Sequence, residues 1–191
     1  MEENQTSGVK AVNNSPSNYD NFLAYLCKMR GGKCATFQPL DIKHQLFNAV
    51  GSFLGIGLIA LLNYTYSLPL LVPSLGASAV LLFSACHVPM AQPRNVIGGH
   101  IVSGTAGVLT YQLLGNYWWT IALAVTLAIF FMNLTHTLHP PGGATAFVAV
   151  YTGQSFGYIG SPVGLGAVLL VLIAVLFNNC SSNRKYPDFW F

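Results

Sequence analysis

Two short runs of small residues, each with one hydroxyl, have the composition of an anion site. They read Gly-Ala-Ser-Ala over 76–79 and Gly-Ala-Thr-Ala over 143–146, and each comes shortly after a proline. A proline before such a run favours an extended chain that then enters a helix. The first turn of that helix has N–H groups without partners and a partial positive charge, which together bind anions. We therefore predict six substrate-binding residues here: Gly76, Ala77, Ser78, Gly143, Ala144 and Thr145.

The two runs lie in longer stretches that resemble each other. Asn63 begins N-Y-T-Y-S-L-P, and Asn133 begins N-L-T-H-T-L-H-P. Each copy predicts a long helix, a proline-broken segment, a short helix and another long helix. Internal repeats with broken segments at matching places are typical of transporters and indicate the binding site. We therefore predict that both short helices begin at one site near the bilayer midplane, and we add Asn63 and Asn133 to it. Close helix packing without a ligand is the alternative for each run.

The middle of the chain is almost without charge. Arg94 is the one Asp, Glu, Lys or Arg between Gln45 and Asn183, whereas soluble domains have about a quarter of such residues. This composition predicts an integral membrane protein. Cation carriers commonly need an acid within the membrane, but an anion needs only N–H groups, hydroxyls and an arginine. Arg94 is therefore included in the site, with an interfacial position against lipid phosphate as its alternative.

Histidines suggest a second chemistry. His136 and His139 are three residues apart, and His87 and His100 precede them. A metal site of the helical type usually has Glu beside His, so we interpret these side chains as structural or proton-linked and predict no metal and no other cofactor. His139 is included among the substrate-binding residues. No nucleophile with a base and no P-loop is evident, so we predict no enzyme; a passive anion channel and an intramembrane histidine–metal enzyme are the alternatives.

The elements that position these residues are helices. We predict an all-α, polytopic transmembrane bundle with two internal repeats, at about 45–115 and 117–180, each with a short half-helix after a proline break. Residues 1–20 are predicted to be a disordered tail, 21–44 an amphipathic juxtamembrane segment and 181–191 a cytoplasmic tail. Six passes in two inverted triplets follow if both broken segments cross, and four passes with parallel copies follow if both re-enter. The charge pattern favours six.

Basic residues flank the apolar region at both ends, which predicts cytoplasmic termini and contact with membrane lipid. No basic fold accompanies them, so no nucleic-acid partner is predicted. Small residues also recur four apart, a spacing that predicts close helix packing within the bundle or in a homo-oligomer. These series are Gly51 with Gly55, Gly99 with Ser103 and Gly107, and Gly160 with Gly164.

The run H-P-P-G-G-A-T-A over 139–146 resembles the HPP family of integral membrane proteins. Two further runs match it, P-S-L-G-A-S-A-V-L-L-F over 73–83 and A-Q-P-R-N-V-I-G-G-H over 91–100, and the resemblance covers roughly residues 40–180. Members are described as having four membrane helices, and some are implicated in nitrite transport in plastids and cyanobacteria. The resemblance therefore implies a transporter of a small inorganic anion, with nitrite as the first candidate. No plastid-type transit sequence is visible, so we predict a bacterial inner membrane.

Overall fold

A computed structural model describes residues 18–30, 32 and 39–190 and divides into two compact units, 1–40 and 41–191. In the first unit, α1 (Asn18–Met29) exposes apolar side chains such as Phe22 and Tyr25. The predicted disordered tail lies outside the described residues except for its last three, which belong to α1.

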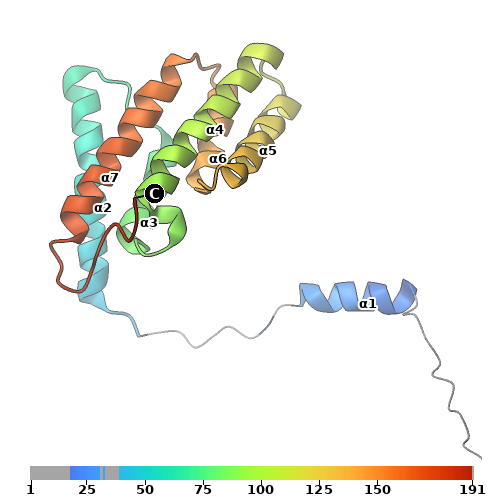
Figure 1. Cartoon of the computed structure of the whole chain (residues 1–191), viewed down its shortest axis with the longest axis horizontal. Helices are drawn as coiled ribbons and strands as arrows, with labels where there is room; N and C mark the ends of the chain where they lie inside the picture. The colour runs from blue at the N-terminus through green and yellow to red at the C-terminus, as the bar shows by residue number, and fades with distance from the viewer. Residues whose placement is uncertain (1–17, 31, 33–38, 191) are drawn as a thin grey trace, which may run out of the picture. The chain divides into compact units, whose positions relative to one another are not determined.

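The second unit is a helical bundle, shown in Figure 1. Every regular element among its described residues is helical. Two helices, α2 and the continuous stretch Ile159–Asn178, are long and apolar enough to cross a bilayer by length and composition. The elements are α2 (Ile42–Tyr66), α3 (Pro73–Ser84), η1 (Pro89–Ala91), α4 (Pro93–Leu114), α5 (Trp118–Leu134), α6 (Pro141–Tyr151), η2 (Ile159–Gly164) and α7 (Leu165–Asn178).

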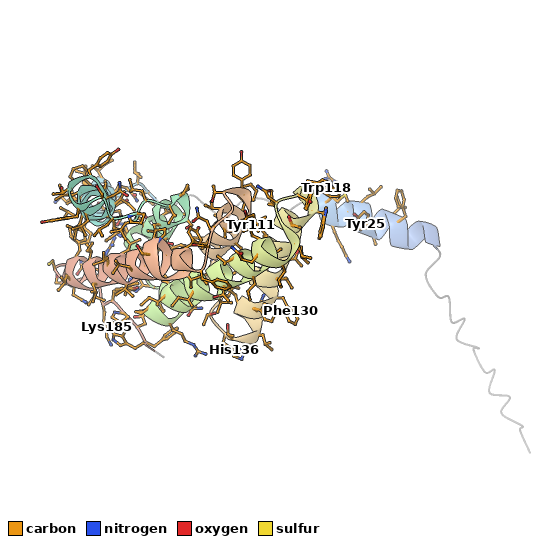
Figure 2. All side chains as sticks on the ribbon, turned by 90° about the horizontal axis from the view of Figure 1, so that it is seen from above. Tyr25, Tyr111, Trp118, Phe130, His136 and Lys185 are labelled. Carbon is orange, nitrogen blue, oxygen red and sulfur yellow. The ribbon has the colours of Figure 1, made fainter. Side chains whose placement is uncertain are left out.

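The first helix of the bundle begins slightly before the predicted apolar stretch. α2 starts at Ile42, three residues before the boundary at 45, because the side chain of Asp41 accepts hydrogen bonds from the N–H groups of Lys43 and His44. The outside of the bundle is rich in large apolar side chains, among them Trp118 and Phe130 of α5 (Figure 2). Such a surface fits contact with lipid.

One end of the bundle, which we call the terminal end, joins the start of α2 to the tail after α7. Arg184 donates a hydrogen bond to Asn48 of α2, and its guanidinium lies 4.8 Å from the ring centroid of Phe47. The buried Tyr186 donates from its hydroxyl to the carbonyl of Ala91, just before α4, at 2.7 Å. Therefore α2 and α4 both begin at the terminal end, and α7 ends there.

The remaining helices alternate in direction between this end and the opposite one, which we call the far end. Arg94 at the start of α4 donates to the carbonyl of Thr135, directly after α5, at 3.3 Å. Asn116, which follows α4, donates to the carbonyl of Tyr151 at the end of α6, at 2.9 Å. Hence α5 runs toward the terminal end, and α6 runs away from it.

Both predicted half-helices are confirmed. α3 has 12 residues and α6 has 11, against 22 in α4, and each begins at a proline. Val72 before α3 is extended, whereas Pro140 before α6 already has helical backbone angles. The breaks start at residues in the left-handed region, Ser67 with φ 54° and His136 with φ 55°. Neither broken segment turns back to the end that it came from, so the order of directions is that of the six-pass arrangement.

The packing crosses between the two predicted copies. α2 packs against α3 and α7, α5 against α4 and α6, and α3 contacts α6. The last helix of each copy thus lies against the other copy, so the three buried clusters of apolar side chains do not follow the boundaries 45–115 and 117–180. The internal repeat itself remains a prediction.

Glycines permit this packing. A Cβ added at Gly51 would lie 2.6 Å from the ring of Phe83, and one at Gly107 would lie 2.7 Å from the carbonyl of Ala146. These contacts confirm the predicted packing role of the small residues in α2 and α4. Gly160 has no atom within 4 Å of such a Cβ, so the prediction fails there within the monomer.

Candidate functional site

A buried group of polar side chains lies where α3 and α6 meet α4. We call it the polar cluster. Each of its side chains is at most 1% exposed. A hydroxyl or imidazole in such a place must find hydrogen-bond partners, because leaving it unpaired costs roughly 1–3 kcal/mol. The cluster consists of Ser74 and Ser78 of α3, His100 of α4, His139 before α6 and Thr145 of α6.

Glycine in α4 brings the break before α6 into this group. A Cβ on Gly99 would lie 2.5 Å from the Cβ of His139, so only glycine allows the extended chain to lie this close to α4. The amide of Asn95 donates to the carbonyl of Leu138 at 3.0 Å and holds the same segment. As a result, the rings of His139 and His100 meet edge to face with centroids 4.9 Å apart.

The polar cluster is one continuous hydrogen-bonded network. The hydroxyl oxygen of Ser78 lies 2.8 Å from Nε2 of His100 and 2.8 Å from Nε2 of His139. On its other side, His100 places Nδ1 2.8 Å from the hydroxyl of Thr145. That hydroxyl lies 2.9 Å from the hydroxyl of Ser74. Two imidazoles and three hydroxyls from four chain segments therefore form a path without a gap.

The network also contacts two neighbouring segments of the chain. At the terminal-end side, Nδ1 of His139 lies 2.8 Å from the carbonyl oxygen of Met90 in η1. At the other side, the hydroxyl of Tyr158 donates to the carbonyl of Thr145 at 3.2 Å. Tyr158 also lines a groove of about 640 Å³, which we call the vestibule. Its lining residues are Asn63, Pro69, Leu71, Val72, Pro73, Phe147, Val148, Tyr151, Thr152, Gln154, Tyr158 and Pro162.

Three of the predicted site residues meet in the polar cluster, namely Ser78, His139 and Thr145. The small residues beside the hydroxyls point elsewhere. Ala77 and Ala144 are exposed on the outside of the bundle, as is Gly76, and Gly143 is half-buried.

The backbone N–H groups in the first turn of α6 are not free to bind an anion, as the prediction required. The N–H groups of Gly142 and Gly143 donate to the carbonyls of His139 and Pro140, at 2.8 and 3.1 Å. In this conformation the polar groups that converge are therefore side chains and not free backbone N–H groups.

The other three predicted residues lie outside the polar cluster. Arg94 is exposed at the terminal end, where it donates to a backbone carbonyl. Asn63 accepts a hydrogen bond from the N–H of Leu70 at 3.3 Å and lines the vestibule. Asn133 is exposed and donates to the carbonyl of Ile129 in its own helix. The structure therefore separates these three from the site that the hydroxyls form.

The predicted substrate-binding residues did not include Ser74, His100 or Tyr158, although His100 was interpreted as structural or proton-linked. Ser74 precedes Ser78 by four residues, a spacing that places both on one helix face. His100 is a polar residue in an apolar helix, and such residues usually face a bundle interior. These two signals were present. Nothing in the sequence distinguished Tyr158 from other tyrosines.

The site contains imidazole and hydroxyl groups without a carboxylate. Within residues 18–30, 32 and 39–190, no three His, Cys, Asp or Glu side chains converge as metal ligands would. Every buried side-chain nitrogen or oxygen in that part of the chain has a hydrogen-bond partner. The arrangement can therefore donate and accept hydrogen bonds and transfer protons.

Comparison with known proteins agrees with this architecture. Residues 38–187 match the family model described as HPP, transmembrane region. A transmembrane protein of Dictyostelium discoideum is 40% identical over 181 residues, which cover 88% of this chain and 58% of the relative. A second transmembrane protein of the same organism is 39% identical over 162 residues, covering 78% and 57%.

The chain thus spans a little over half the length of these curated relatives. No solved structure matches it. The family model covers most of the bundle, including α2 to α7 and the whole polar cluster. This chain therefore belongs to the HPP family of transmembrane proteins, as its H-P-P-G-G-A-T-A run predicted.

Proposed function

We propose that this protein carries a small inorganic anion across a membrane, with nitrite as the first candidate, and that the anion binds at the polar cluster. One observation supports this most directly. Hydroxyls and imidazoles from four segments meet in the interior of a bundle that has no carboxylate between Asp41 and Asp188. Such a site offers hydrogen-bond donors and no negative charge to repel an anion.

The two half-helices strengthen the site electrostatically. α3 begins at Pro73, one residue before Ser74, and α6 begins at Pro141, four residues before Thr145. A helix start has about half a positive elementary charge. Two such starts beside one enclosed group of donors favour a bound anion, and Coulomb interactions there are screened less than in water.

The closed state of the cluster favours a carrier over a channel. All five side chains are buried, and Tyr158 lies between them and the vestibule. A channel needs a continuous path, whereas a carrier opens its site to one side at a time. We propose movement of the α3 and α6 starts relative to α4 as the opening step, and transport without catalysis as the activity.

The orientation belongs to the same proposal. The terminal end holds the basic residues that flank the bundle, including Lys43 and Arg184. By the positive-inside rule this end faces the cytoplasm. The bacterial inner membrane, predicted from the sequence, remains a prediction.

Uptake into proteoliposomes tests the function. Purified protein should give saturable nitrite uptake, which other small anions inhibit in proportion to their affinity. Ser78→Ala and Thr145→Ala each remove one donor, with a net contribution near 1 kcal/mol, and should reduce uptake about fivefold. The double variant should lose more than either.

Ser103→Ala is the matched control. The hydroxyl of Ser103 is also buried in α4, but it donates to the carbonyl of Gly99 at 2.6 Å in its own helix, outside the network. Uptake by this variant should stay within about twofold of the wild type. Absence of saturable uptake for nitrite and for a panel of small anions, with folded protein in the liposomes, would reject the proposal. Conductance far above carrier turnover would identify a channel instead.

A further inference from the structure

We propose that a pocket at the terminal end, which we call the basic pocket, binds the phosphate headgroup of an anionic phospholipid. This is a second site, separate from the polar cluster, and it does not depend on the proposed transport. The pocket has a volume of about 360 Å³, within the range of roughly 300–1,000 Å³ that is usual for ligand sites. Its lining residues are Asp41, Lys43, His44, Phe47, His87, Ser181, Asn183 and Arg184.

Three separate parts of the chain build the basic pocket. The start of α2 supplies Lys43 and His44, the segment after α3 supplies His87, and the tail after α7 supplies Ser181 and Arg184. Ammonium, guanidinium, imidazole and hydroxyl groups therefore surround one space. All four kinds of group can donate hydrogen bonds, and the oxygens of a phosphate group accept them.

Arg184 is the charge that the fold holds in place. Its half-buried guanidinium donates to the carbonyl of Phe83 and to the side-chain oxygen of Asn178, each at 2.9 Å, and also to the side-chain oxygen of Asn48. Nε2 of His44 accepts a further bond from it, because a guanidinium can only donate. All four acceptors are neutral, so they position the charge of Arg184 without compensating it.

The neighbouring carboxylates do not compensate the two cations of the pocket. In the part of the chain that the structure describes, the one ion pair joins His87 and Asp188, at 3.8 Å, so neither Lys43 nor Arg184 has a carboxylate partner there. Asp41 is the one acidic residue of the lining, and its Oδ1 already accepts from two N–H groups at the start of α2. A partly buried charge without a counter-ion has a desolvation cost, which an anion in the pocket would offset.

The face of α2 that continues from Lys43 indicates that this anion belongs to a lipid. Leu46, Val50 and Phe53 follow Lys43 at spacings that keep all four on one side of the helix. These three apolar side chains are 61%, 51% and 77% exposed. The helix from Lys43 to Phe53 spans about 15 Å, half the hydrocarbon thickness of a bilayer. A lipid with its headgroup in the basic pocket can lay an acyl chain along this face, whereas free phosphate gains nothing from it.

The charges of the pocket predict which phospholipid it prefers. Phosphatidylglycerol has one negative charge that no other group in its headgroup balances. Phosphatidylcholine has the same phosphate beside a quaternary ammonium, which Lys43 and Arg184 would repel. A basic side chain near the membrane surface contributes about one order of magnitude or slightly less to the binding of an anionic lipid. The two cations together should therefore favour phosphatidylglycerol about 30-fold.

Titration of the purified full chain in detergent tests this preference. The two lipids, with identical acyl chains, are added separately, and native mass spectrometry measures the Kd of the first bound lipid. Thermal unfolding gives an independent measure, because a lipid that binds only the folded protein raises the Tm. Phosphatidylglycerol at about 100 times its Kd should raise the Tm by roughly 5–11 °C. Equal Kd values and equal Tm shifts for the two lipids would overturn the proposal.

Lys43→Gln is the most informative variant, because this exposed side chain lines the pocket at its rim and its loss leaves the bonds of Arg184 in place. It should weaken binding of phosphatidylglycerol about fivefold, and Lys43→Arg should retain it. Lys185→Gln is the matched control, since Lys185 is also exposed and basic at the terminal end but does not line the pocket. Its Kd should stay within about twofold of the wild type.

Two results with these variants would overturn the basic pocket. An unchanged Kd in Lys43→Gln would remove Lys43 from the site. An equal loss in Lys43→Gln and Lys185→Gln would show that basic residues attract anionic lipid without a defined pocket.

Two further measurements identify the source of the phosphate and its position. Glycerol phosphate, which has the headgroup chemistry without acyl chains, should not displace the lipid at equal concentration. Equal displacement would identify a soluble phosphate as the ligand and overturn the lipid proposal. A phosphatidylglycerol analogue with a photoactivatable headgroup should crosslink within 41–47 or 181–184, and crosslinks confined to other segments would overturn it. None of these measurements uses nitrite, so failure of the proposed transport leaves their outcome unaffected.

Discussion

Replacement of Gly99 by alanine should disrupt the polar cluster, although Gly99 is not one of its members. The added Cβ would lie 2.5 Å from the Cβ of His139 and 2.7 Å from the carbonyl oxygen of Thr137. Non-bonded carbon atoms ordinarily lie about 3.5–4.0 Å apart. Neither contact is the end of a flexible side chain, so the segment before α6 must move away from α4 by about 1 Å.

The magnitude follows from these distances. Overpacking of this kind costs roughly 1–3 kcal/mol, and a chain of this size loses about 2–4 °C in Tm per kcal/mol. A movement of about 1 Å also lengthens the 2.8 Å contact between Ser78 and His139 beyond hydrogen-bond range. Loss of this bond, at about 1 kcal/mol, should reduce uptake about fivefold.

Thermal unfolding in detergent and nitrite uptake in proteoliposomes measure the two effects. Gly57→Ala in α2 is the matched control, because a Cβ there has no atom within 4 Å. It should maintain or raise the Tm, since alanine favours a helix by about 1 kcal/mol over glycine. If Gly99→Ala leaves both Tm and uptake unchanged, the close approach of His139 to α4 is wrong.

Further predictions concern the terminal end. Arg94→Ala should leave the Tm within about 2 °C because its bond is exposed, and any reduction in uptake should disappear at high salt, which screens a surface charge. An equal reduction in uptake at all salt concentrations would instead indicate that Arg94 belongs to the binding site. Burial raises the pKa of Tyr186, so its contribution to stability is complete below about pH 10 and is lost as the pH rises above that value. Tyr186→Phe should lower the Tm at neutral pH and abolish this decline in stability at alkaline pH. If the decline is unchanged, its assignment to Tyr186 is wrong. Burial likewise raises the pKa of the Cys86 thiol despite a nearby guanidinium, so a thiol reagent should modify it far more slowly than the exposed Cys180 until the protein unfolds. In intact cells Cys27 and Cys180, each retained as the sole cysteine, should resist an impermeant reagent, and labelling of one alone would contradict termini on the same side.

The positions of the half-helices could be read from the sequence because proline acts locally. Pro73 and Pro141 have no N–H to donate and restrict the conformation of the residue before them. Each therefore favours the start of a helix, whatever that helix packs against. The directions of the helices also agree with the charge pattern. The first feature depends on residues that are close in sequence. The second depends on the membrane and the water that surround the whole bundle.

The directions of the side chains within the half-helices follow from helical periodicity. We included Gly76 and Ala77 with Ser78 because they are adjacent in sequence. In a helix, however, neighbours point about 100° apart, whereas residues four apart share a face. Ser74 and Ser78 therefore enter the cluster together, and the two residues between them that we had included lie outside. This part of the site was predictable from helical periodicity.

The composition alone determined that this chain lies in a membrane, because an almost uncharged stretch of this length has no soluble surface, and the H-P-P-G-G-A-T-A run determined its family. Only the tertiary structure decided the partners within the site. His100 meets Ser78 and His139 across separations of 22 and 39 residues in the chain, through the glycine contact at α4. Arg94, although the one charge in the region, lies away from them because the start of α4 is at the end of the bundle. Long-range contacts of this kind depend on how whole helices pack, and no local pattern of residues specifies them.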